Sequence, residues 1–151
     1  MEMQSYVTGF VDGEGCFSVS FSKRTKMKMG IEVRPSFAVS QHRRSKDIIL
    51  WLHRFFGCGG VRYSRSDQNF KYEVRSIADL VRKIIPHFER YPLQTSKKDD
   101  FQKFKEVCLI VHSNHHLNQD GMRKVIALSG QINRCGKKKF ERTDLLKLIA
   151  R

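Results

Sequence analysis

The chain has 151 residues, and this length predicts a single domain over residues 1–151. Lysine and arginine number 29 against 15 acidic residues, and the net charge of +14 predicts a polyanionic partner, with nucleic acid as the first candidate. No apolar run is long enough to cross a membrane and no C-x-x-C pair is present, so we expect neither a membrane partner nor a disulfide framework.

Residues 5–15, S-Y-V-T-G-F-V-D-G-E-G, begin with apolar side chains at helical spacing and predict a short helix. Asp12 and Glu14 fall at the end of this helix. The helix dipole is negative there, so each carboxylate costs about 0.3–1 kcal/mol. We therefore expect the helix to deliver an acid to a site that holds a cation. An ordinary Gly-rich turn with solvated acids is the alternative.

Gly9 and Gly13 are four residues apart and leave one face of this helix without side chains. Glycine inside a helix costs about 1 kcal/mol relative to alanine. Close approach of a second helix would offset that cost. The sequence therefore predicts that a partner helix packs on this face.

Alternating apolar and polar residues then predict two β-hairpins. The strands cover residues 16–22 and 31–40, then 61–64 and 71–75. A helix between the hairpins begins after Ser45, a potential cap, and ends at Gly57. Pro35 removes a ladder donor, which indicates an edge or a bulge in the second strand.

Helical spacing returns after the second hairpin. A helix follows the cap Ser76, and Pro86 should kink its last turn. Another helix covers 101–111, and the chain is helical from about Leu117 to Ile149 with a break at 135–139. The expected fold is α+β, with the order α-β-β-α-β-β-α, a four-stranded antiparallel sheet backed by helices, and C-terminal helices.

One face of the expected sheet is polar and basic. An antiparallel sheet needs cover on one side only, and a β-ribbon fits the major groove of DNA. A solvated face is the alternative, but it explains poorly why basic residues recur on both hairpins. The residues expected to contact DNA are Ser18, Ser20, Ser22, Arg24, Lys26, Lys28, Glu32, Arg34, Ser36, Ser40, Arg62, Ser64, Lys71, Glu73 and Arg75.

The stretch V-T-G-F-V-D-G-E-G at residues 7–15 resembles the signature of the LAGLIDADG homing endonucleases. The matching positions are Gly9, Asp12, Glu14 and Gly15. Thr8 and Gly13 replace the two alanines of the family name and are also small. The resemblance covers nearly the whole chain, because the order of elements predicted for this chain is also that of the family.

The resemblance implies a metal-dependent active site. Glu14, with backbone near Gly13, would hold Mg²⁺ or Mn²⁺, Gln41 would position water, and Lys97 would stabilise charge. Gln41 ends the second strand, and Lys97 follows the stretch Y-P-L-Q-T-S at residues 91–96. Ser45 stands where some members have a basic residue, so other cations that could complete the site remain open, namely Arg44, Lys46 and Lys98.

The implied function is an intron-encoded, site-specific endonuclease that cuts double-stranded DNA at a long, near-palindromic target, without an organic cofactor. One signature supplies one acid, so the resemblance implies a homodimer. Its interface would contain Tyr6, Gly9, Phe10 and Gly13. The alternatives are an RNA-binding intron maturase and a non-catalytic DNA-binding regulator. We expect an intracellular protein, and an organelle (chloroplast or mitochondrion) and a bacterial cytoplasm both remain open.

Overall fold

The computed structural model describes residues 2–133 and 140–150, which divide into two compact units. The first unit runs to Cys16 and continues with Ser36–Lys98, and the second holds Phe17–Pro35 and the residues from Asp99 onward. Each unit is described by itself. The prediction of a single domain remains a prediction.

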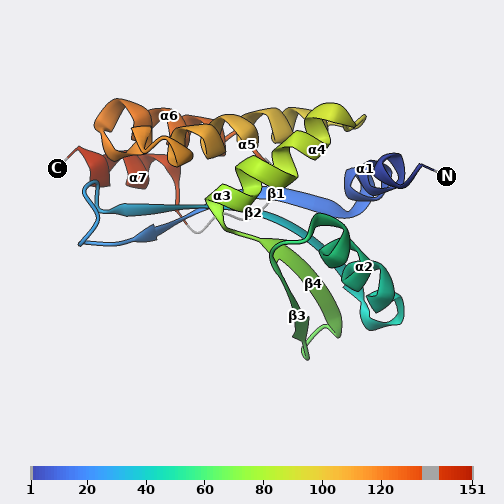
Figure 1. Ribbon diagram of the computed structural model, residues 1–151. Coiled ribbons are helices and arrows are strands. Elements are labelled where there is room, and N and C mark those ends of the chain that lie inside the picture. The colour runs from blue at the N-terminus through green and yellow to red at the C-terminus, as the bar shows by residue number, and fades with distance from the viewer. Residues whose placement is uncertain (1, 134–139, 151) are drawn as a thin grey trace. The chain divides into compact units, whose positions relative to one another are not determined.

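The order of elements follows the predicted α-β-β-α-β-β-α pattern and ends in helices (Figure 1). The elements through the fourth strand are α1 (Met3–Glu14), β1 (Gly15–Lys23), β2 (Ile31–His42), η1 (Arg43–Ser45), α2 (Lys46–Phe56), β3 (Gly60–Ser64) and β4 (Asn69–Val74). Those that follow are α3 (Ile77–Asp79), η2 (Leu80–Ile84), α4 (Ile85–Arg90), α5 (Lys97–His112), η3 (His115–Leu117), α6 (Gln119–Ser129) and α7 (Arg142–Ile149).

The strands form one sheet in the order β1-β2-β4-β3, which confirms the predicted α+β fold with a four-stranded antiparallel sheet. β4 pairs antiparallel with β2 from Phe37 opposite Val74 to His42 opposite Asn69. It also pairs antiparallel with β3, where Arg62 lies opposite Lys71. Pro35 precedes the stretch of β2 that pairs with β4, so its missing N–H breaks no bond of that ladder.

The first unit is built around a cluster of aromatic rings. The Phe37 ring centroid lies 5.8 Å from that of Phe56, 6.2 Å from Tyr72 and 5.7 Å from Phe88. Tyr72 and Val74 alternate along β4 with Lys71 and Glu73, so the same strand supplies both the core and a polar face. In Figure 1, α2 lies beside β4.

Two helix ends in this unit follow the sequence prediction, and two other features do not. α2 ends at Gly57, which is left-handed with φ of 67° and suits glycine, and Ser76 accepts a hydrogen bond from the backbone of Asp79. Ser45 precedes α2, but its side chain makes no capping hydrogen bond. Pro86 falls in the first turn of α4, not in a last turn. There its missing N–H is tolerated, after the wider π-helical turn of η2.

The second unit has its own apolar core. Phe17 packs between Phe101 and Phe104, with ring centroids 5.3 and 5.2 Å away. A cluster of further buried residues in this unit consists of Phe21, Ile31, Val33, Val107, Met122, Val125, Ile126, Leu145 and Ile149. The break expected at 135–139 lies outside the described residues. No helix in the described part of the chain has the length and apolar character needed to cross a membrane.

Candidate functional site

The end of α1 and the start of β1, which we call the α1 tip (residues 12–15), place a carboxylate at the surface. The helix ends at Gly15, whose backbone is extended, and a Cβ there would lie 2.6 Å from a methyl carbon of Val11. Only glycine therefore allows so abrupt a change from helix to strand. The Glu14 side chain is exposed, and Gln41, at the end of β2, donates a hydrogen bond from Nε2 to Glu14 Oε2 at 3.1 Å.

Asp12 lies two residues before Glu14 but has very different surroundings. Its carboxylate accepts hydrogen bonds from the backbone N–H of Gln94 at 2.8 Å and of Thr95 at 3.2 Å, and from the Thr95 hydroxyl at 2.5 Å. Partial burial would raise the pKa of Asp12, but these bonds and the charge of Lys97 outweigh burial and hold the pKa below its usual value. Asp12 thus anchors the loop before α5.

Lys97 connects this loop to the α1 tip. Its side-chain ammonium donates to the backbone carbonyls of Val11 at 3.0 Å and Asp12 at 3.1 Å. The backbone N–H of Lys97 donates to the Thr95 hydroxyl at 3.2 Å. A cation at the carbonyl end of a helix is stabilising. Lys97 therefore offsets the cost of placing two carboxylates there, a role that the sequence did not reveal.

The other candidate cations make no such contact with the α1 tip. Lys98 is exposed and bonds the Thr95 carbonyl through its backbone N–H, and Arg44 bonds His42 through its backbone. Lys46 is exposed at the start of α2. Of the four cations considered from the sequence, Lys97 is the one whose charged group is held at the end of α1.

The outer face of β3 and β4 gathers charges around Glu73, and we call Glu73 with Ser36, Arg62, Lys71 and Arg75 the Glu73 cluster. The Glu73 carboxylate lies 3.2 Å from a nitrogen of Arg62, 3.4 Å from that of Lys71 and 3.2 Å from one of Arg75. It also accepts a hydrogen bond from the Ser36 hydroxyl at 2.9 Å. Ser36 is only 8% exposed. Ser36 therefore lies on the outer face, as predicted, but its hydroxyl donates to Glu73 and the surrounding charges bury it. Contact between Ser36 and DNA stays a prediction.

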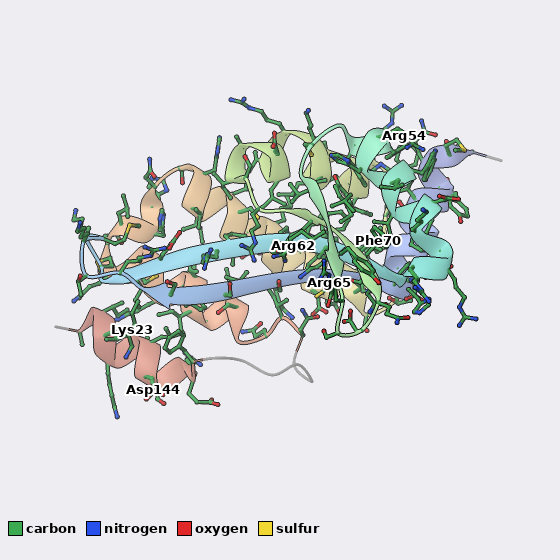
Figure 2. All side chains as sticks on the ribbon, turned by 90° about the horizontal axis from the view of Figure 1, so that it is seen from below. Lys23, Arg54, Arg62, Arg65, Phe70 and Asp144 are labelled. Carbon is green, nitrogen blue, oxygen red and sulfur yellow. The ribbon has the colours of Figure 1, made fainter. Side chains whose placement is uncertain are left out.

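The remaining residues predicted to contact DNA differ in their surroundings. In the second unit, Arg24 pairs with Glu32 at 3.0 Å, and the Ser20 hydroxyl donates to the Arg34 carbonyl at 3.4 Å. The exposed ones are Ser20, Arg24, Lys26, Lys28, Arg34, Ser40 and Ser64, and Ser18, Ser22 and Glu32 are half-buried. Sequence reasoning left out Arg65, which is exposed in the turn after β3 (Figure 2).

The face of α1 that carries Gly9 and Gly13 is open. A Cβ at either glycine would meet nothing within 4 Å. Beside them Tyr6 is 37% exposed, and its ring centroid lies 6.3 Å from that of Phe10 and 6.0 Å from that of Trp51 on α2. Trp51 is half-buried, and the sequence did not place it beside Tyr6 because helical periodicity alone does not show which side chains of two helices meet.

The donor set at the α1 tip fits a divalent ion that is completed by other molecules. The described residues contain no group of three or more histidine, cysteine, aspartate or glutamate side chains that could hold a metal ion. Mg²⁺ typically uses one or two protein carboxylates together with water and phosphate oxygens. One exposed glutamate at a glycine-rich helix end meets that requirement.

Comparison with known proteins assigns the family. A family model described as LAGLIDADG endonuclease matches residues 7–108. The chain therefore belongs to the LAGLIDADG endonuclease family, which confirms the resemblance seen in the sequence.

The curated relatives fall into two groups, proteins several times as long as the matched part of this chain and proteins of similar length. Probable intron-encoded endonuclease 3 of Neurospora crassa is 30% identical over 127 residues, which are 83% of this chain and 24% of that protein. The chain spans 24% to 40% of four such curated relatives. Homing endonuclease I-ApeII of Aeropyrum pernix is 28% identical, and the match covers 97% of this chain and 90% of that protein.

Solved structures also include one chain of similar length and one about twice as long. The homing endonuclease I-TnaI superposes with a TM-score of 0.85 and 33% identity, covering 99% of this chain and 98% of that one. I-SmaMI bound to cleaved DNA gives a TM-score of 0.89 and 31% identity, covering 99% of this chain and 49% of that one. I-SmaMI was also solved on uncleaved DNA in the presence of calcium ions.

Proposed function

We propose that this chain is a site-specific endonuclease that hydrolyses both strands of DNA at a long target and uses Mg²⁺ or Mn²⁺. The observation that carries the proposal is the exposed Glu14 carboxylate at the α1 tip, hydrogen-bonded by Gln41 and close in sequence to the carbonyls that hold Lys97. Membership of an endonuclease family and the names of the relatives support the same activity.

Glu14, with the backbone near Gly13, would hold the divalent ion. When bound, the ion would activate water and stabilise the oxygen that leaves the scissile phosphate. Gln41 donates one N–H to Glu14, so its orientation is fixed and its remaining amide groups can position that water. Lys97 has three N–H donors and uses two on backbone carbonyls, which leaves one to stabilise charge at the phosphate.

The polar face of the sheet would bind the target. Arg62, Lys71 and Arg75 lie on β3 and β4 or directly after them, with spacing that suits a major groove, and arginine pairs with guanine edges there. Lys26 and Lys28 lie in the exposed connection between β1 and β2 and suit contact with phosphates. Binding should therefore combine sequence-specific and salt-sensitive parts.

The active form would be a homodimer, because one chain supplies one Glu14 and a duplex has two strands to cut. A second copy would cover the open Gly9 and Gly13 face together with Tyr6 and Phe10, and the two-fold symmetry implies a near-palindromic target. Light scattering should find a dimer for wild type and a monomer for Gly9→Leu. Gln102→Leu, at an exposed position of α5, is the matched control. A stable wild-type monomer with and without target DNA would rule out the homodimer.

A cleavage assay tests the activity itself. The substrate is a plasmid that carries the intron-free insertion site of the host gene, and we expect cutting of both strands with Mg²⁺ and none with EDTA. A protein that binds this plasmid but never cuts it would instead be a DNA-binding regulator. Promotion of intron splicing without DNA cleavage would identify an RNA maturase.

A further inference from the structure

The Glu73 cluster places one anion among three cations on a face proposed to bind a polyanion. Glu73 Oε1 lies 3.2 Å from Arg62 Nη2 and 3.2 Å from Arg75 Nε. Glu73 Oε2 lies 2.9 Å from the Ser36 hydroxyl and 3.4 Å from Lys71 Nζ. A carboxylate here weakens attraction to DNA, so its presence calls for a physical reason.

Strand register supplies part of that reason. Arg62 and Lys71 lie directly opposite each other on β3 and β4, and like charges in that position are destabilising. Glu73 is two residues further along β4, on the same face, and contacts both cations. The residues opposite Glu73 on its two neighbouring strands are Ala38 and Gly60, which are small enough for long side chains to reach across them.

The Glu73 carboxylate has no hydrogen-bond acceptor position left for a DNA base. An ionised carboxylate offers about four acceptor positions, two on each oxygen, and each oxygen of Glu73 already has two partners. The side chain is 12% exposed, because the three cations cover it. Burial would raise the pKa of Glu73, but the Ser36 hydrogen bond and the charges of Lys71 and Arg75 outweigh it and keep the pKa below its usual value.

The arginines, in contrast, keep donors free for DNA. A guanidinium has five N–H donors. Arg75 contacts Glu73 through Nε, which leaves the edge formed by its two terminal nitrogens. Arg62 contacts Glu73 through Nη2, which has two N–H groups, so its second N–H stays free beside an N–H of Nε or Nη1. Two neighbouring N–H groups on one arginine can bind O6 and N7 of guanine together. Each arginine is thus held at one point and remains able to read a base.

We propose that Glu73 is a positioning residue that determines specificity, holding Arg62, Lys71 and Arg75 in one arrangement for reading guanine edges in the major groove. The inference rests on the proposed DNA-binding function. It assigns Glu73 itself no base contact, in contrast to the direct contact expected from the sequence.

Loss of this anion should change specificity and affinity in opposite directions. In Glu73→Gln the three cations repel one another and are no longer fixed, so discrimination at the base pairs that they read should fall about tenfold or more. Affinity for unrelated duplexes should rise, because the DNA-facing surface loses a negative charge. The log–log salt slope should become steeper by about one unit for each additional phosphate that the freed cations neutralise.

Selection from a randomised duplex library tests this inference, with EDTA present so that no DNA is cut. The variants are wild type, Glu73→Gln, Glu73→Asp and the charge-matched control Glu106→Gln, which changes an exposed glutamate of α5. Glu73→Asp keeps the charge but shortens the reach by one methylene. Positioning therefore predicts that both Glu73 variants lose preference at the same base pairs, while Glu106→Gln selects the wild-type sequence.

The outcomes separate this inference from the function on which it rests. If wild type selects no sequence, the proposed DNA recognition fails. If wild type selects a sequence and Glu73→Gln selects the same one with equal preference, the positioning role is wrong. Wild-type preference in Glu73→Asp would also overturn it, since charge alone would then suffice. Glu73→Asp also decides the question if Glu73→Gln does not fold.

Discussion

Two glutamates of the first unit show opposite uses of the same functional group. At the α1 tip, Glu14 is exposed and accepts one hydrogen bond from the described residues, from Gln41. On the sheet face, Glu73 is 12% exposed and has four partners. Under the proposed function, Glu14 is left open for an incoming cation, whereas Glu73 organises side chains of the chain itself. Asp12, saturated by Gln94 and Thr95, belongs with Glu73 although it is only two residues from Glu14.

The largest expected effect is on the cleavage rate and comes from replacing Glu14, whose carboxylate is open. Glu14→Gln keeps the shape of the side chain and removes its charge, so cleavage should fall by about 1,000-fold or more while DNA affinity persists or rises. Cleavage rates in Mg²⁺ and equilibrium DNA binding in EDTA measure the two effects separately. Glu106→Gln is the matched control, and cutting by Glu14→Gln at the wild-type rate would show that Glu14 is not the ligand.

A smaller effect on cleavage is expected when Asp12, whose carboxylate is saturated with hydrogen bonds, loses its charge. Asp12→Asn replaces a charged acceptor of several hydrogen bonds by an amide with one oxygen. The variant should unfold at lower urea concentration, with a loss of about 1.5–3 kcal/mol. Because the loop also carries Lys97, the cleavage rate constant should fall about 10- to 100-fold with little change in DNA affinity. In the control, Asp144→Asn changes an exposed aspartate of α7 (Figure 2). Equal stability of Asp12→Asn and wild type would contradict the anchoring role.

The smallest effect concerns His87, a half-buried side chain that stays neutral. His87 Nε2 lies 3.1 Å from the Thr8 hydroxyl, and that hydroxyl donates to the Tyr91 carbonyl, so Nε2 carries the proton and donates. Burial lowers the pKa of His87 to about 4, whereas an unfolded histidine titrates near 6.5. Between these values the unfolded state binds more protons than the folded state.

The stability due to His87 should therefore be fully present above about pH 6.5 and lost as pH falls toward 4. Partial exposure limits the effect to about 1–2 kcal/mol. Urea unfolding of wild type at pH 7.5 and pH 5 measures it, with His87→Gln as the control that keeps an N–H donor and does not titrate. The same pH dependence in both proteins would exclude His87 as its source.

Much of the fold could be predicted because it depends on local patterns. Alternation along residues 71–75 placed Tyr72 and Val74 in the core, and Gly57 marked the end of a helix. Alternation also assigned Ser36 to the outer face, but it could not reveal that the charges around Glu73 bury Ser36. The π-helical turn before Pro86 has no periodic signal in the sequence.

The site was predicted less completely than the fold. Resemblance to the family selected Glu14, Gln41 and Lys97, and residue spacing alone did not. The partners of Asp12 lie 82 and 83 residues away in the sequence, so no local pattern connects them. The Glu73 cluster depends on the register of β3 with β4 and on side-chain rotamers, and neither can be read from the order of residues.

Metal binding to the DNA complex tests the contrast between open and saturated carboxylates most directly. Electron paramagnetic resonance can count bound Mn²⁺ on complexes with a non-hydrolysable target duplex, for wild type, Glu14→Gln and Asp12→Asn. We predict that Glu14→Gln loses the Mn²⁺ that wild type binds and that Asp12→Asn retains it. Retention of Mn²⁺ by Glu14→Gln together with its loss from Asp12→Asn would contradict the account.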